Sequence, residues 1–458
     1  MKLAYNQKGG PAKSSRNKGP YAQHFHLTPE QGLLNDPNGL CYFQGYYHIF
    51  YQYNPHATDH STKYWGHVRT KDFVTYEQLP VALKSDDWFD KNGVYSGGAI
   101  VHEDTLYLFY TGNTKDEAGR RTSYQCIATS TDGIHFTKLG PVTEQLPDYT
   151  GHVRDPKVWY DATVQGWWML LGAQRLDKTG DTVAFFSKDL KDWDYRGSIF
   201  QFDQPLGYMW ECPNLVQLDG REFLFVCPQG KSKEDLRFQN IHNSGYFALE
   251  GKLIDLMAGD KDLMAAESPY RCIDERTFIE LDYGFDFYAP QVFTDDKGRS
   301  LLIGWVGVPD IEFQYDVPTR EWAHTITMPR VLSLNEAGRV CQWPVEEMDA
   351  LHGKAVSFTT EAAHGASGFV GSSSYDMFTM DGACGASFAG GTCNVRIENI
   401  QGEGRLLLNA DLEFVVHGDT AELVFLGPAG RFRTLRRLPL SALSAGKIED
   451  IRLMVDTS

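Results

Sequence analysis

The sequence has no hydrophobic run long enough to cross a bilayer, since no stretch approaches the roughly 20 apolar residues that a spanning helix requires. Residues 1–23 carry five Lys or Arg before Pro20 but contain no apolar segment, so they do not read as a secretory signal. We expect residues 1–23 to form a flexible tail. The missing signal favours a cytoplasmic location without a membrane partner.

Paired cysteine motifs are also missing. The eight cysteines are scattered without C-x-x-C spacing, and the chain has no N-x-S/T sequon. This pattern fits buried, reduced thiols better than a disulfide framework or a zinc site. No spacing among the 14 histidines matches a known metal site, so we expect no metal.

The chain has no excess of positive charge, because 60 Asp or Glu outnumber 43 Lys or Arg and give a net charge of −17. This balance argues against a nucleic-acid or anionic-membrane partner, since either would favour a basic face. An uncharged, polyhydroxylated small molecule is compatible with it. Nothing in the composition indicates an oligomeric state.

What the chain does contain is a repeated pattern of antiparallel hairpins. Its 458 residues, 42% of them hydrophobic, are enough for two domains. Two β-rich runs around a polar turn occur five times, at residues 39–52, 99–112, 157–173, 214–229 and 291–307. After the first three hairpins come an acidic turn, an aromatic residue and a further β-like run, at residues 70–83, 130–142 and 187–200. Four strands recurring about every 60 residues predict a five-bladed β-propeller.

A short motif of small or functional residues precedes each hairpin. Alone, N-D-P-N-G would be read as turn chemistry. In a propeller, however, the first strand of each blade lines the central channel, so residues just before it gather at one end of the axis. Three of the motifs carry a carboxylate, and we expect these carboxylates to share one pocket. The motifs are Asn35-Asp36-Pro37-Asn38-Gly39, Tyr95-Ser-Gly-Gly-Ala99, Arg154-Asp155-Pro156, Glu211-Cys212-Pro213-Asn214 and Tyr288-Ala-Pro-Gln291.

The pattern changes after Pro329. Residues 342–351 predict a short helical linker, with a proline near its start and acids in its first turn. From about residue 355 the chain is rich in Gly, Ser and Ala, and its alternating runs predict a β-sandwich. We therefore expect an all-β protein with a five-bladed propeller at residues 24–335, a linker at 336–354 and a sandwich at 355–458.

Two of the three carboxylates have neighbours that suit the two roles in glycoside hydrolysis, which needs one ionised carboxylate and one proton donor. The asparagine amides beside Asp36 would keep it ionised. Glu211 stands between Trp210 and Cys212, and this apolar setting would raise its pKa and suit an acid/base.

Asp155 follows Arg154, whose guanidinium would keep that carboxylate charged. Asp155 is then suited to hold substrate hydroxyls and to offset positive charge in an oxocarbenium-like transition state. Taken singly, Arg154-Asp155-Pro156 fits a surface turn with an ion pair worth roughly 0.2–1 kcal/mol, and Glu211 fits a charge at a strand edge. Three carboxylates at equivalent places in three blades favour the functional interpretation.

These motifs resemble those of glycoside hydrolase family 32, which contains invertases, fructan hydrolases and sucrose-6-phosphate hydrolases. The resemblance runs from about residue 24 to the end of the chain and rests on N-D-P-N-G, R-D-P and W-E-C-P in that order. It implies a five-bladed propeller followed by a β-sandwich. It also implies that Asp36 is the nucleophile, Glu211 the acid/base and Asp155 the transition-state stabiliser in retaining hydrolysis of a β-fructofuranoside. No cofactor is implied.

The resemblance also implies contacts with a sugar substrate and shows two departures. Members often carry Trp eight residues after the glutamine that matches Gln52, whereas His60 stands here, as in sucrose-6-phosphate hydrolases. With the missing signal, this favours a cytoplasmic enzyme for sucrose or sucrose-6-phosphate. The last residues, 450–458, end inside a motif that usually continues, so we expect a truncated sandwich. Besides His60, the implied contact residues are Asn35, Gln52, Trp65, Tyr95, Ser96, Arg154, Tyr288 and Trp305.

Other interpretations compete with this one. An inactive carbohydrate-binding propeller would lack one of the three carboxylates, and a WD-repeat scaffold would have shorter blades with G-H and W-D dipeptides. An exo-acting fructan hydrolase or a fructosyltransferase shares the covalent intermediate, so the carboxylates do not separate these from hydrolysis of sucrose. The cation that would bind a substrate phosphate is equally open, with Lys63, Arg120 and Arg121 as candidates.

Overall fold

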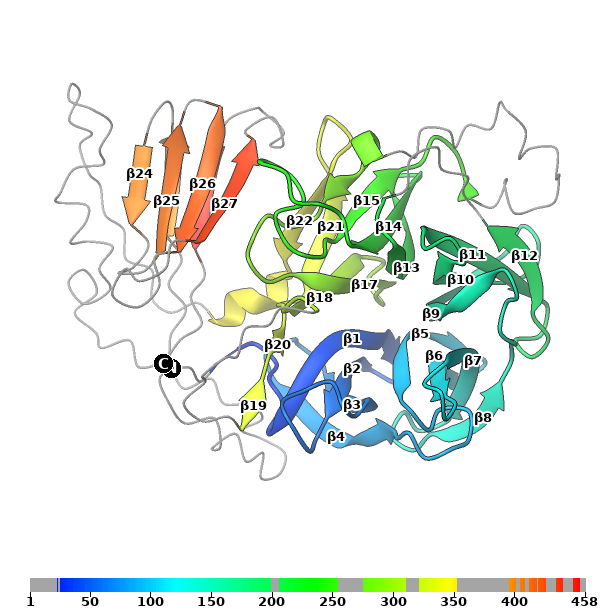
Figure 1. Cartoon of the computed structure of the whole chain (residues 1–458). Coiled ribbons are helices and arrows are strands. Elements are labelled where there is room, and N and C mark those ends of the chain that lie inside the picture. The colour runs from blue at the N-terminus through cyan, green and yellow to red at the C-terminus, as the bar shows by residue number, and fades with distance from the viewer. Residues whose placement is uncertain are drawn as a thin grey trace, which may run out of the picture.

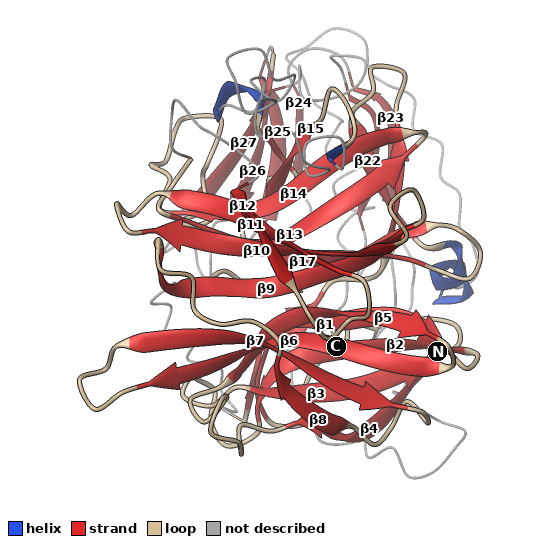
Figure 2. Ribbon diagram, turned by 90° about the vertical axis from the view of Figure 1, so that its right-hand side faces the viewer, coloured by secondary structure: helices blue, strands red, loops and turns tan. Residues whose placement is uncertain are grey.

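The computed structural model describes residues 23, 25–198, 206–253, 275–309, 321–351, 395–400, 404–407, 412–417, 419–425, 434–439 and 448–453. Apart from Gln23, the predicted tail lies outside these residues. The ordered elements are almost all strands, as Figure 2 shows. Within these ranges no helix is both long and apolar enough to cross a membrane.

Five sheets form a ring in which the first strand of each sheet lies innermost (Figure 1). These first strands contact one another in ring order, so they line a common axis. The predicted five-bladed β-propeller is therefore confirmed. The first three sheets contain β1 (Gly32–Phe43), β2 (Tyr46–Asn54), β3 (Tyr64–Thr70) and β4 (Tyr76–Leu83); β5 (Val94–His102), β6 (Thr105–Lys115), β7 (Arg121–Ser130) and β8 (Thr137–Pro141); and β9 (Tyr149–Asp161), β10 (Gly166–Arg175), β11 (Gly180–Ser187) and β12 (Asp194–Ser198).

The last two sheets complete the ring, and two short strands close it. β19 (Trp322–Ala323) pairs in parallel with β1, and β20 (Thr325–Ile326) pairs with β18. The Ile326 N–H also donates to the Leu27 carbonyl at 3.2 Å, so the start of the chain is tied to the fifth sheet. The fourth and fifth sheets contain β13 (Met209–Leu218), β14 (Arg221–Gln229), β15 (Gly245–Ala248) and β16 (Ile279–Glu280), with the 3₁₀ helix η3 (Glu275–Thr277) before β16; and β17 (Tyr288–Thr294), β18 (Ser300–Val306), β21 (Arg330–Leu334) and β22 (Val340–Pro344).

The main hydrophobic clusters lie between neighbouring sheets, one for each of the five contacts around the ring. Between the third and fourth sheets, Trp168 and Leu170 of β10 pack with Trp210 of β13 and Phe247 of β15. Each sheet is thus covered on both faces. This burial explains why strands such as β14 read as continuous apolar runs instead of alternating ones.

The five predicted hairpins are confirmed by the antiparallel pairing of the first two strands in every sheet. Their turns contain residues in the left-handed region, which a tight two-residue hairpin turn needs. Gln44 and Gly45 have φ of 48° and 80°, and Asp219 and Gly220 have φ of 49° and 78°. The polar residues at these turns therefore serve backbone geometry.

The acidic turns that follow the first three hairpins share one hydrogen-bond pattern. At the β3–β4 turn, the Thr70 hydroxyl accepts the Phe73 N–H, and Asp72 Oδ1 accepts the N–H groups of Val74 and Thr75. The same bonds recur at Ser130 with Asp132 and at Ser187 with Asp189. The repeated sequence pattern is thus a backbone cap on the outer strand pair of each sheet.

The segment after β21 leads to the C-terminal sheets. β22 pairs with β21 although it lies in the range predicted for the linker, and the 3₁₀ helix η4 (Glu346–Leu351) follows it. The β-sandwich comprises a two-stranded and a four-stranded sheet, the second of which stands beside the propeller in Figure 1. The Arg437 N–H donates to Gln239 Oε1 at 2.7 Å and so joins the sandwich to the loop after β14. The sandwich strands are β23 (Val395–Ile400) paired with β28 (Ile448–Leu453), and β24 (Gly404–Leu407), β25 (Leu412–His417), β26 (Thr420–Phe425) and β27 (Thr434–Pro439).

Candidate active site

Each innermost strand is interrupted by a register shift at its motif. In β1, residues 35–36 face only Gln52 of β2, because the pairs on either side are Leu34 with Tyr53 and Pro37 with Tyr51. The same two-against-one arrangement occurs at residues 155–156, 212–213 and 289–290, and β5 has an extra residue at 96. A bulge bends a strand and redirects its side chains. All five motifs therefore present their side chains at one end of the axis.

Three of these bulges hold a non-glycine residue in the left-handed region, with φ of 67° at Asp155, 47° at Cys212 and 48° at Ala289. A proline follows each of the three residues, so no backbone N–H is left unpaired at the next position. Such conformations cost of order 1–3 kcal/mol each and persist only where the surrounding structure imposes them. The strain of this propeller is thus concentrated where the carboxylates lie.

The Asp36 carboxylate accepts one hydrogen bond from its own motif and one from the motif of the second sheet. The Ser96 hydroxyl donates to Oδ2 at 2.5 Å, and Asn35 Nδ2 donates to Oδ1 at 2.9 Å. Lys63 Nζ donates to the Asn35 amide oxygen at 3.0 Å, so a cation stands behind this pair. Burial raises the pKa of Asp36 above its usual value, although Ser96, Lys63 and Asn35 each favour the charged form.

The Glu211 carboxylate is held by side chains from three sheets. Arg154 donates to Oε1 from Nε and Nη2 at 2.9 and 2.7 Å. Gln229 Nε2 and the Tyr288 hydroxyl donate to Oε2 at 2.5 and 2.7 Å. Burial alone would raise the pKa of Glu211, but Arg154 and the Tyr288 hydroxyl outweigh it, and this pKa lies below its usual value. The prediction that apolar neighbours raise the pKa of Glu211 is therefore wrong.

Asp155 is buried beside this ion pair, and the Cys212 N–H donates to its Oδ2 at 2.9 Å. Burial raises the pKa of Asp155 to about 7 despite the guanidinium of Arg154, and the charge of Glu211 adds to the rise. The prediction that Arg154 keeps Asp155 charged is thus wrong near neutral pH. The guanidinium donates hydrogen bonds to Glu211 instead of to its neighbour in sequence.

We expect Asp155→Asn to raise the melting temperature at pH 8 by about 2 °C or more. A folded-state pKa of about 7 lies above the value of about 4 that an unfolded Asp has. The folded state therefore binds the extra proton between these values, and stability is lost as the pH rises through this range. Asn removes the buried charge and keeps an acceptor for the Cys212 N–H. Thermal unfolding from pH 5 to pH 8 should show a gain that shrinks toward pH 5, and a variant less stable than wild type at pH 8 would contradict this account.

The other predicted site residues reach the same region, some of them through a supporting contact. Gln52 Nε2 donates to the Val94 carbonyl at 2.9 Å, and Trp65 Nε1 donates to the Tyr95 carbonyl at 3.1 Å. Both side chains are buried and fix the strand that carries Ser96. Their direct contact with a substrate stays a prediction.

The rings of Trp305, Tyr288 and His60 lie close together. The Trp305 ring lies 6.4 Å from that of Tyr288 and 6.1 Å from that of His60, measured between ring centroids. His60 is exposed, and its Nδ1 lies 2.6 Å from Lys63 Nζ. His60 therefore stands at the rim of the site, and its role toward a substrate stays a prediction.

Two groups that bind the residues of the site were not predicted from the sequence. Gln229 binds Glu211, and the Thr111 hydroxyl accepts the Asp155 N–H at 3.1 Å. Gln229 ends the fourth hairpin pattern as Gln52 ends the first, so the repeat itself carried a signal for it. Thr111 carries no such mark, because a threonine in a strand is ordinary.

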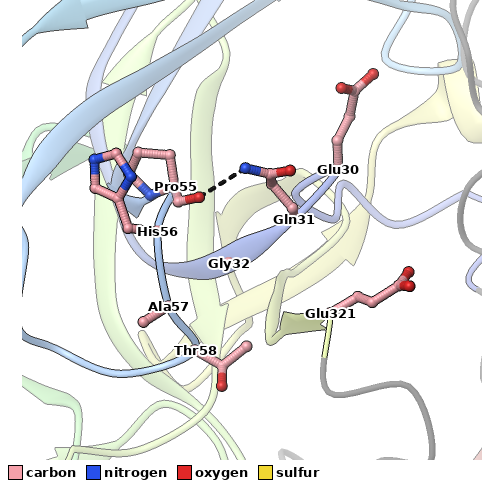
Figure 3. Close-up of a pocket in the computed structure, with 8 residues that line it drawn as sticks. All are labelled: Glu30, Gln31, Gly32, Pro55, His56, Ala57, Thr58 and Glu321. Atoms are coloured by element: carbon pink, nitrogen blue, oxygen red, sulfur yellow. Dashed lines mark hydrogen bonds between the residues drawn. The ribbon is translucent and has the colours of Figure 1, made fainter.

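A separate pocket of about 390 Å³ lies at the start of β1 (Figure 3). No predicted site residue is among the residues that line it. The Gln31 side chain donates to the Pro55 carbonyl at 2.8 Å beside this pocket. The pocket therefore adjoins the loop that carries His60 and Lys63. Its lining residues are Glu30, Gln31, Gly32, Pro55, His56, Ala57, Thr58 and Glu321.

Three carboxylates elsewhere, those of Asp86, Asp87 and Asp90, lie close enough together to hold a metal ion. Lys138 Nζ already lies 2.6, 3.1 and 2.7 Å from them. The Lys138 ammonium therefore takes the place that a metal ion would have among these three carboxylates.

Comparison with known proteins places the chain in a family. The model of the N-terminal domain of glycosyl hydrolases family 32 matches residues 26–344. Sucrose-6-phosphate hydrolase of Bacillus subtilis is 44% identical over 342 residues, which cover 73% of this chain and 67% of that protein. The sucrose-6-phosphate hydrolase of Klebsiella pneumoniae is 43% identical over 337 residues, covering 72% and 68%. The chain thus spans about two thirds of the length of these relatives.

Solved structures agree with this placement. Sucrose-6-phosphate hydrolase from Lactobacillus gasseri has a TM-score of 0.78 at 28% identity, with 97% of this chain and 86% of that chain covered. A family 32 β-fructofuranosidase of Bombyx mori has a TM-score of 0.74 at 28% identity, with the same coverage. The chain belongs to glycoside hydrolase family 32 and is a glycoside hydrolase, as its motifs predict.

Proposed function

We propose that the protein is a retaining β-fructofuranosidase that cleaves sucrose-6-phosphate, with Asp36 as nucleophile, Glu211 as acid/base and Asp155 as transition-state stabiliser. The observation that carries the proposal is the mutual influence of these three carboxylates. The charge of Glu211 raises the pKa of both Asp36 and Asp155, and the charge of Asp36 also raises that of Asp155. Three motifs far apart in sequence therefore act on one reacting centre.

In the first step, Asp36 attacks the anomeric carbon of the fructosyl unit while Glu211 gives its proton to the glycosidic oxygen, so that the glucosyl part leaves and a fructosyl ester forms. In the second step, Glu211 takes a proton from water, which attacks the same carbon and releases Asp36 and fructose. Ser96 and Asn35 orient the Asp36 carboxylate for this attack. Asp36 and Glu211 are also partly exposed, as a substrate-contacting pair must be.

The pKa directions of Glu211 and Asp155 differ from what the first step requires. Arg154 favours a charged Glu211, whereas burial favours a protonated Asp155. A sugar hydroxyl that donates to Asp155 would stabilise its charged form. The three carboxyl groups would then retain one proton on Glu211, where the leaving oxygen needs it. We infer that substrate binding moves this proton between the two groups.

The choice of sucrose-6-phosphate over other fructosides rests on the relatives. Those at 44% and 43% identity are named sucrose-6-phosphate hydrolases, and so is the Lactobacillus structure. A point variant of the Bombyx enzyme, 27% identical to this chain, has been solved in complex with sucrose. Fructan hydrolysis and fructosyl transfer are kept as alternatives, because they use the same three carboxylates.

The test is the ratio of kcat/KM for sucrose-6-phosphate over sucrose, with inulin and levan as further substrates. We expect a ratio above about 10, since a single charged hydrogen bond to phosphate contributes roughly that much. Free fructose equal to the glucose or glucose 6-phosphate released would support hydrolysis. Fructose well below it would show transfer, and faster cleavage of inulin or levan would replace the proposed substrate.

We further propose a cytoplasmic location for the enzyme. Five of its cysteines lie in the described part of the chain as free thiols, four of them buried: Cys41, Cys126, Cys212, Cys227 and Cys341. Free thiols are typical of a reducing compartment. Cell fractionation with an antibody against the protein tests this location.

A further inference from the structure

The structure separates the three cations that the sequence left as candidates for a substrate phosphate. Arg120 is exposed, and its Nε donates to Asp116 Oδ2 at 2.7 Å. Asp116 also accepts the Arg120 N–H at 2.8 Å, so this arginine completes its own loop. An arginine that is already paired with a carboxylate has little charge and few hydrogen-bond donors left for an anion. Arg120 is therefore a suitable control residue.

Lys63 belongs to the nucleophile side of the site. Its Nζ donates to the Asn35 amide, which in turn donates to Asp36. Burial lowers the pKa of Lys63 to about 8, although Asp36 favours its charged form. Because Asp36 must reach the fructosyl carbon, Lys63 lies with the fructosyl unit and orients the Asn35–Asp36 pair.

Arg121 begins β7 and lies against the strand that carries Arg154. Gly151, at the start of β9, has no room for a Cβ because the Arg121 carbonyl is packed against it. The Arg121 guanidinium stands over the Tyr95 ring, 5.2 Å from its centroid. Among the described residues, no carboxylate forms a salt bridge with Arg121. Its charge is therefore available to a ligand at the rim of the site.

A second cation stands near the same strand end. The Thr150 hydroxyl donates to Gln174 Oε1 at 3.1 Å, and the exposed Lys178 donates to this oxygen at 3.4 Å. The next residue of the same strand, His152, has its Nδ1 2.7 Å from Arg154 Nη1. Burial lowers the pKa of His152 to about 3, and the charges of Arg154, Arg121 and Lys178 act in the same direction, whereas that of Glu211 opposes them. Three cations thus lie near residues 150–152 in a protein whose net charge is −17.

This group lies on the acid/base side of the site. A proton donor must come within hydrogen-bond reach of the leaving oxygen, so the leaving group lies beside Glu211. Arg154 joins Glu211 to His152, and Arg121 and Lys178 lie near Gly151 and Thr150, the two residues before that histidine in β9. We propose that Arg121, supported by Lys178, binds the phosphate of the glucosyl leaving group; this inference rests on the proposed function and deepens it.

The chemistry of the two side chains suits this role. A guanidinium can donate two parallel hydrogen bonds to phosphate oxygens, while an ammonium acts as a mobile point charge. Stacking on Tyr95 fixes the plane of Arg121 before the ligand arrives, so less side-chain freedom is lost on binding. Arg121 is then the specificity-determining residue, and Lys178 contributes a smaller share.

Arg121→Gln is the decisive variant. We expect kcat/KM for sucrose-6-phosphate to fall about 10- to 100-fold, and the preference over sucrose to fall by about 10-fold or more. The inhibition constant for glucose 6-phosphate should rise by a similar factor relative to that for glucose. Arg121→Lys keeps one charge and should restore part of the preference. Arg120→Gln removes the adjacent arginine, which lies in the exposed loop before β7, and should leave all of these values within about 2-fold.

Each outcome has a distinct meaning. A wild-type enzyme that prefers sucrose-6-phosphate, with the preference kept in a folded Arg121→Gln variant, would overturn this inference and leave the proposed function standing. Loss of the preference in Lys63→Met but not in Arg121→Gln would move the phosphate to the other side of the site. A wild type without any preference for the phosphorylated sugar would reject both the phosphate site and the proposed substrate.

Discussion

Asp36→Asn should lower kcat for sucrose-6-phosphate and for sucrose by roughly 10⁴-fold or more while the protein stays folded. An amide oxygen is too weak a nucleophile to form the fructosyl ester, so the first step fails for every leaving group. The substitution is nearly isosteric, and Asn keeps an oxygen that can accept the Ser96 hydroxyl. Initial rates, together with the melting temperature of each variant, measure the effect.

The matched control for this variant is Asp72→Asn. Asp72 caps the β3–β4 turn at the far end of the same sheet and accepts two backbone N–H groups there. The Asp72→Asn variant should lose some stability but keep its activity, because the β3–β4 turn lies away from the three carboxylates. Near-normal turnover in a pure Asp36→Asn preparation would contradict the assignment of Asp36 as the nucleophile. Mass spectrometry of an acid-quenched wild-type reaction should also find a fructosyl adduct on the peptide that contains Asp36.

The fold could be predicted from the sequence because its signals are local. Each hairpin has its turn residues and apolar strands within about 16 residues, and the capped turns repeat as Thr70 with Asp72, Ser130 with Asp132 and Ser187 with Asp189. The closure of the ring was not predicted. β19 and β20 have two residues each, too few for a periodic pattern, and their pairing depends on the return of the chain to β1 and β18.

The motifs that carry the three carboxylates could also be found from the sequence, because each stands directly before a predicted hairpin. The electrostatic environment of these carboxylates could not be predicted from the sequence. The partners of Glu211 are Arg154, Gln229 and Tyr288, which lie 57, 18 and 77 positions away from it in the chain. Neighbours in sequence suggested an apolar setting for Glu211 and a paired guanidinium for Asp155. The fold exchanges these settings, since Arg154 donates to Glu211 of the fourth sheet and Asp155 is buried.

The positive-φ residues at the bulges connect this exchange to function. Asp155 and Cys212 would each be more stable in an extended strand, yet the Cys212 N–H reaches the Asp155 carboxylate only because both bulges are present. Strain of this kind is typical of sites where geometry is selected over stability. The increase in stability expected for Asp155→Asn at pH 8 has the same origin, because it removes a charge that the fold buries at the bulge.

Glu211→Gln should lower kcat/KM for sucrose-6-phosphate by roughly 100- to 10,000-fold, the range that a positioned general acid contributes. The glucosyl oxygen is a poor leaving group and needs the proton, whereas a nitrophenolate leaves without one. An aryl β-fructoside with a nitrophenol leaving group should therefore lose less than about 10-fold in kcat/KM, which reports formation of the fructosyl ester. The limb of the wild-type pH profile that reports loss of the Glu211 proton should disappear in the variant.

The control for Glu211→Gln is Glu222→Gln in the neighbouring strand β14. Glu222 is a buried carboxylate that accepts the Gln217 amide at 3.0 Å near the β13–β14 turn, so its removal tests the same change of charge outside the site. Its activity on both substrates should stay near that of wild type. Equal losses on the two substrates in Glu211→Gln would mean that the carboxylate holds the site together and does not deliver a proton. A large loss confined to the poor leaving group is the result that a proton donor produces, because the lost hydrogen bonds of Arg154, Gln229 or Tyr288 would slow both substrates alike.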